Sequence, residues 1–100
     1  MDSIVKSNLP EIKFLLQRYG VVSASLFGSA ATGNMNDESD VDFLVSFNPD
    51  LNYTQYEENY FDLLYALQTL LNKNVDLIAE ETLSNPYLIQ SVNSQKIAVL

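Results

Sequence analysis

Apolar residues recur at helical spacing near the start of the chain. Ile12, Leu15, Leu16 and Tyr19 follow the segment Asn8-Leu9-Pro10-Glu11 and precede Gly20. Asparagine is a common N-cap, proline suits the first turn and glycine often ends a helix. We therefore expect an amphipathic helix that starts at an Asn8 cap and stops at Gly20.

A longer apolar stripe lies in the second half of the chain and is made of Tyr60, Leu63, Leu64, Leu67, Leu70 and Leu71. The preceding segment Thr54-Gln55-Tyr56-Glu57 matches a capping box. The pattern predicts that the longest helix runs from this box to Asn72 or Lys73 and covers a sheet.

Short runs of β-branched and apolar residues predict strands at 21–27, at about 40–47 and at 75–79. Residues 29–33 have room only for a helical turn, and a final helix is expected to start at Ser84-Asn85-Pro86. Residues 96–100 could continue that helix or form an edge strand. This order predicts an α+β fold, an α/β sandwich with a small mixed sheet covered by helices, and a single domain over residues 1–100.

Composition narrows the chemistry. The 100 residues include no cysteine and no histidine, so proton transfer and metal binding would fall to carboxylates, hydroxyls, lysine or tyrosine. The net charge of −8 and the lack of a Lys/Arg cluster argue against direct nucleic-acid binding and suit a basic protein partner. With no signal-like or membrane-spanning apolar run, we expect a cytoplasmic protein without membrane contact.

Asp40 and Asp42 are candidate metal ligands. Strand side chains alternate, so the two carboxylates would share one face, roughly 6 to 7 Å apart at their Cα atoms, while Val41, Phe43 and Val45 face the core. Carboxylate oxygens suit Mg²⁺. Taken alone, the Asp-x-Asp pattern is weak and more often marks the solvated start of a strand. A calcium loop does not fit, because Ser39 replaces the needed glycine and Val45 the bidentate glutamate.

Gly28-Ser29 follows the first predicted strand. Glycine lets another group approach the backbone closely, and serine before a helical turn offers a hydroxyl and backbone N–H groups to a phosphate. By itself the pair is also a common turn. The glycine and lysine pattern of a P-loop is absent from the sequence.

Together, Gly-Ser, ten intervening residues and Asp-x-Asp resemble the signature of the DNA polymerase beta superfamily of nucleotidyltransferases. The segments FGSAATG and SDVDFLV, and the small size, look like the minimal nucleotidyltransferases, the MntA-type antitoxins of HEPN/MNT toxin–antitoxin pairs. The resemblance covers residues 21–47 closely and the later elements more loosely.

The resemblance implies a third carboxylate on the neighbouring strand, and Asp76 occupies a suitable place there. In the family pattern Asp40 and Asp42 would ligate two Mg²⁺ ions, Asp76 would complete one site and help deprotonate the attacking hydroxyl, and Gly28 and Ser29 would hold the phosphates of ATP. The implied reaction transfers AMP from ATP to a tyrosine hydroxyl of a HEPN-domain toxin, which would make the chain an antitoxin.

Two other readings stay open. Ala30 and Ala31 stand where many relatives carry arginine, so the positive contact to the triphosphate is missing or comes from Lys73, Lys6 or a partner. The chain could therefore be an antitoxin that acts by binding alone, with a vestigial site. A small-molecule transferase is less compatible with 100 residues. The sequence leaves open the nucleotide base and whether the chain forms homo- or hetero-oligomers.

Overall fold

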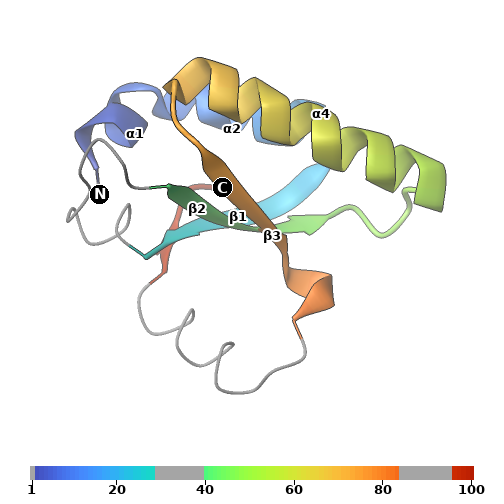
Figure 1. Cartoon of the computed structure of the whole chain (residues 1–100). Coiled ribbons are helices and arrows are strands. Elements are labelled where there is room, and N and C mark those ends of the chain that lie inside the picture. Colours follow the sequence, from blue (N-terminus) through green and yellow to red (C-terminus); the bar gives the residue numbers. More distant parts are fainter. Residues whose placement is uncertain (1, 29–39, 84–95) are drawn as a thin grey trace.

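The computed structural model describes residues 2–28, 40–83 and 96–100. Within them a four-stranded mixed sheet has the strand order β3-β2-β1-β4. Helices α2 and α4 lie together over one face of this sheet (Figure 1), where α2 packs on β1 and α4 packs on β3. The arrangement confirms the predicted α+β class.

The N-terminal part contains one more helix than expected. Helix α1, Ser3–Ser7, is capped by Asp2, whose side chain accepts hydrogen bonds from the backbone N–H groups of Ile4 and Val5. Helix α2, Leu9–Arg18, follows directly. Asn8 is the N-cap residue of α2, as predicted, but its side chain makes no cap hydrogen bond to that helix. The side-chain amide instead donates to the Ile4 carbonyl of α1, 2.8 Å away.

The predicted strands all form. β1, Val21–Phe27, pairs antiparallel with β2, Val41–Phe47, and β2 pairs parallel with β3, Val75–Ala79. Of the two alternatives for residues 96–100, the edge strand is right, since β4, Ile97–Ala98, pairs antiparallel with β1. The predicted turn at 29–33 and the predicted helix from Ser84 lie outside the described residues.

Helix α4 spans Tyr53–Leu71 and ends at Asn72, which adopts a left-handed conformation with φ of 52°. Its capping box is made by Asn52 and Gln55, each side chain accepting from the other's backbone N–H at 2.8 and 3.1 Å. The box predicted at 54–57 is therefore two residues late, because asparagine also caps well and Gln55 completes the reciprocal pair. None of the helices described is both long and apolar enough to cross a membrane.

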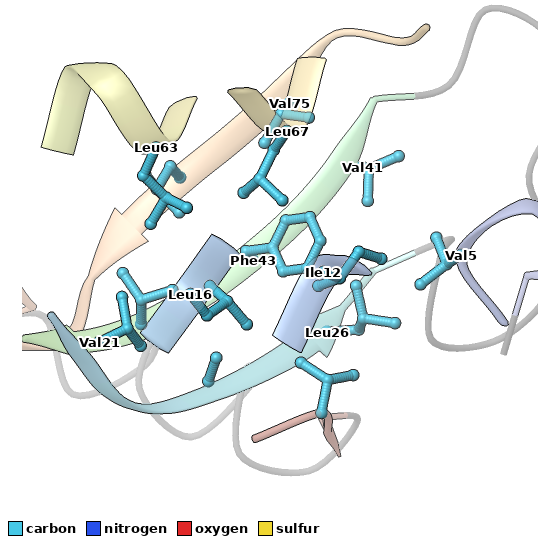
Figure 2. Packing of buried hydrophobic residues seen from close by; sticks show 14 of the residues in the cluster. Val5, Ile12, Leu16, Val21, Leu26, Val41, Phe43, Leu63, Leu67 and Val75 are labelled. Carbon is cyan, nitrogen blue, oxygen red and sulfur yellow. The ribbon is translucent and has the colours of Figure 1, made fainter. Parts of the chain in front are cut away.

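The core fills the space between the helices and the sheet (Figure 2). The side chains of Ile12, Leu16, Leu63 and Leu67 point from α2 and α4 onto β1 and β2. On β2 the core-facing residues are those that alternation predicts: Val41, Phe43, Val45 and Phe47, each no more than 3% exposed. Because these residues anchor one face of β2, Asp42 is held on the opposite face.

Candidate active site

Asp42 lies at the centre of the candidate site. On one side its Cα pairs with Phe27, the last residue of β1, and on the other side it pairs with Asp76 of β3. Directly paired residues of neighbouring strands project from the same face of a sheet. The end of β1 and two carboxylates are therefore brought into one row across three strands.

The carboxylates influence one another. Burial raises the pKa of Asp42 above its usual value, and the negative charges of Asp76 and then Asp40 raise it further. Asp40, just before β2, and Asp76 are exposed, whereas Asp42 is half-buried. On β3 the neighbours Val75 and Leu77 are buried, so Asp76 projects from the opposite face, the face that also carries Asp42. A like-charge cluster of this kind costs free energy unless protons or cations neutralise it.

Gly28 lies against the Asp42 carboxylate. Its φ is +66°, and a Cβ built at this position would lie 2.7 Å from Asp42 Oδ2. Only glycine fits this conformation and this close approach without strain. The glycine predicted to contact phosphate thus borders the central carboxylate. Ser29, its predicted companion, lies outside the described residues.

The three carboxylates suit a divalent cation by their chemistry. Mg²⁺ in proteins is bound by oxygen ligands, mostly carboxylates, and a cation shared by Asp42, Asp76 and Asp40 would offset the repulsion between their negative charges. Across residues 2–28, 40–83 and 96–100, no three acidic, histidine or cysteine side chains already form a compact ligand set. Since Asp40 and Asp76 are exposed, they can change rotamer to converge with Asp42.

Of the two lysines considered as phosphate contacts, Lys73 lies in the turn between α4 and β3, next to Asn74, whose carbonyl accepts from Val41 N at 2.9 Å. Val41 directly follows Asp40, so the Lys73 backbone lies at the same end of the sheet as the carboxylates. Lys6 is an exposed residue of α1.

Two further residues, Tyr60 and Glu81, support β3 and β2, and the sequence did not predict these roles. The Tyr60 hydroxyl of α4 donates to the carbonyl of Leu77, the residue after Asp76. Glu81 accepts from Ser46 Oγ at 2.9 Å and from the backbone N–H of Phe47 at 3.1 Å. Glu81 is exposed, yet its carboxylate holds the end of β2. Neither contact leaves a signal in local sequence, because the partners are 17 to 35 residues apart.

The fold and the carboxylate row define a nucleotidyltransferase-type enzyme. The nucleotidyltransferase domain family matches residues 11–99, and this chain belongs to that family. A Methanocaldococcus jannaschii protein named as a proposed protein adenylyltransferase is 39% identical over 87% of this chain and 85% of its own length. Protein adenylyltransferase MntA of Thermococcus cleftensis is 31% identical over 85% of this chain and 79% of its own.

Two solved structures have the same fold. A proposed minimal nucleotidyltransferase is 31% identical, with a TM-score of 0.77 over 97% of this chain and 95% of its own. A toxin–antitoxin structure with AMP-PNP is 25% identical, with a TM-score of 0.74 over 93% of this chain and 73% of its own. The predicted family and enzyme class are confirmed.

Proposed function

We propose that this chain transfers AMP from ATP, with Mg²⁺, to a tyrosine hydroxyl of a HEPN-type toxin and thereby acts as its antitoxin. The observation that carries the proposal is the pairing of Asp42 with Asp76, with Gly28 against the Asp42 carboxylate and Asp40 just before β2. Support comes from the toxin–antitoxin structure with AMP-PNP, which is 25% identical to this chain, and from the relatives that are named protein adenylyltransferases. Both support the nucleotide and partner assignments.

In this proposal each site residue has its own role. Asp40 and Asp42 would hold Mg²⁺ and Asp76 would complete the ligand set, while Gly28 and Ser29 would receive the phosphates. When bound, the cation neutralises charge on the triphosphate and lowers the pKa of the incoming hydroxyl. The hydroxyl oxygen bonds to the α-phosphorus as the bond to pyrophosphate breaks, and the Asp76 carboxylate helps take up the hydroxyl proton. Histidine is therefore not required.

Intact mass measurement tests the catalytic proposal. The purified chain is incubated with ATP, Mg²⁺ and a HEPN-type protein, chosen from the product of the neighbouring gene if that product is of this type. We expect the partner's mass to rise by one or more AMP increments, and we expect this rise to disappear with EDTA. An unchanged partner mass, with folded protein that binds Mg²⁺, would contradict transfer to this partner.

A second candidate function is neutralisation by binding alone. It is favoured by Ala30 and Ala31 in place of arginine and by 13 acidic against 5 basic residues. The double substitution Asp40→Asn/Asp42→Asn separates the two functions in cells that express the toxin. An enzyme should lose protection, whereas a binding antitoxin should still protect. Co-purification of the double variant with the toxin controls for folding.

A further inference from the structure

A groove of about 420 Å³ lies between helix α4 and the outer strand β3. Its α4 wall is aromatic and is built from Tyr53, Tyr56, Tyr60 and Phe61. Tyr53 is 81% exposed and Phe61 44% exposed. Figure 1 shows α4 running beside β3, which is the outermost strand of the sheet on that side. The groove therefore places exposed aromatic rings beside the edge strand of the sheet.

The edge of β3 is already partly occupied by side chains. Val75 N donates to Gln68 Oε1 at 3.4 Å, the Leu77 carbonyl accepts from the Tyr60 hydroxyl, and the Ala79 carbonyl accepts from Thr82 Oγ1 at 2.7 Å. A guest that extended the sheet by strand pairing would have to displace these three side-chain contacts. An occupant that leaves them in place would bind by inserting side chains among the rings.

The negative charges around the groove favour the binding of a positively charged segment. Glu57 lines it, Glu80 and Glu81 directly follow β3, and the pKa of Tyr56 is raised by burial and then by the negative charge of Glu81. The sequence has no lysine or arginine between Arg18 and Lys73, so α4 itself carries no positive charge. Aromatic faces beside carboxylates are the surroundings that favour a guanidinium group.

The groove also adjoins the carboxylate row. Leu77 lines it and is the residue after Asp76, and the charge of Asp76 raises the pKa of Tyr60, after the larger effect of burial. Asp76 projects from the sheet face opposite the helices, so a segment anchored in the groove would bring a side chain to the carboxylates by passing around the β3 edge. We propose that this groove docks an arginine-bearing segment of the acceptor protein, with the arginine stacked among the tyrosines and Phe61. The inference rests on the proposed function, whose acceptor it positions.

Binding of the HEPN-type protein in the absence of ATP tests the groove separately from catalysis. The double variant Tyr53→Ala/Phe61→Ala removes the most exposed rings, and Phe14→Ala on α2, where Phe14 is 61% exposed, is the matched control. By calorimetry we expect the groove variant to bind at least about tenfold more weakly, as for an interface hot spot, and the control to bind like the parent. Glu57→Gln should reduce the salt dependence of binding.

Several results would overturn the inference. One is parent-like affinity of the groove variant, and another is no binding of the HEPN-type protein by the parent chain. A loss of AMP-PNP affinity in the groove variant would assign the rings to the nucleotide base. Conversion of a parent dimer to a monomer would assign them to a second copy of the chain. If the parent chain binds the HEPN-type protein through the groove but transfers no AMP to it, the docking proposal is supported and the catalytic proposal is contradicted.

Discussion

At the scale of a single residue, the carboxylate of Asp42 has opposite effects on the stability of the fold and on the proposed metal binding. It is half-buried beside two like charges, which raises its pKa and disfavours its ionised form in the fold. The same proximity is what allows three carboxylates to share a cation. The negative charge of Asp42 therefore lowers the stability of the fold when no cation is bound. The same clustering of carboxylates is what the proposed metal-dependent chemistry requires.

Asp42→Asn should separate stability from activity. We expect AMP transfer to fall by at least about 100-fold, because a metal ligand is lost, while thermal unfolding in EDTA shifts upward. In the parent the folded state binds the Asp42 proton more tightly than the unfolded state does. Its contribution to stability is thus lost as pH rises from the ordinary carboxyl pKa through the raised one.

Thermal unfolding across the acidic range in EDTA measures this effect. The asparagine variant should lack the part of the pH slope that Asp42 supplies. Equal or lower stability of the variant at neutral pH would mean that the carboxylate is favourably held, in conflict with the geometry described.

Gly28→Ala should affect both the fold and the site. The left-handed conformation costs about 1–2 kcal/mol for alanine, and the added Cβ would press on Asp42 Oδ2. Gly20→Ala is the matched control, since Gly20 also has a positive φ, of +85°, and its Cβ would meet Leu51 instead. We expect both to lower the unfolding midpoint, and only Gly28→Ala to weaken Mn²⁺ binding measured by electron paramagnetic resonance. Equal Mn²⁺ affinity in both variants would contradict the close approach.

Among the elements, β3 is the least supported strand of the site. It pairs with β2 on one side only, and side chains of Gln68, Tyr60 and Thr82 bind its outward backbone groups. Asp76 lies between two of these contacts. Helix α4 therefore does more than cover the core, because two of its side chains hold the strand that carries a proposed ligand.

Tyr60→Phe removes one of these contacts while keeping the ring. We expect a loss of about 1 kcal/mol in the free energy of unfolding and faster hydrogen exchange in residues 75–79. We also expect weaker Mn²⁺ binding, because Asp76 is then less well held. Tyr65→Phe is the control, since the Tyr65 ring is 60% exposed on the same helix. Unchanged exchange in β3 would show that pairing with β2 alone holds the strand.

For the whole molecule, the net charge of −8 makes self-repulsion a general cost. Monovalent salt should raise the unfolding midpoint by screening this repulsion. Mg²⁺ at matched ionic strength should raise it further, since a cation that binds the folded state stabilises it. In Asp40→Asn/Asp42→Asn we expect the NaCl effect to remain and the additional Mg²⁺ effect to disappear. An equal Mg²⁺ effect in both proteins would place the bound ion elsewhere.

Much of the fold could be predicted because the relevant signals are local. Residues 21–27 and 75–79 are the strands β1 and β3 to the residue, since β-branched runs stand out between polar segments. The Asn52 cap and helix α1 were missed because capping residues are common in loops as well. Whether an Asn or Asp caps depends on its backbone conformation, which the tertiary structure decides.

By itself the sequence determined the helix and strand periods, and with them the face on which Asp42 and Asp76 project, because side-chain alternation is a property of each strand alone. Only the tertiary structure decided that Asp42 and Asp76 are direct partners, that Gly28 borders the Asp42 carboxylate, and that Tyr60 and Glu81 support the adjoining strands. Strand order and register arise from the joint packing of α2, α4 and the sheet, so no single segment contains them.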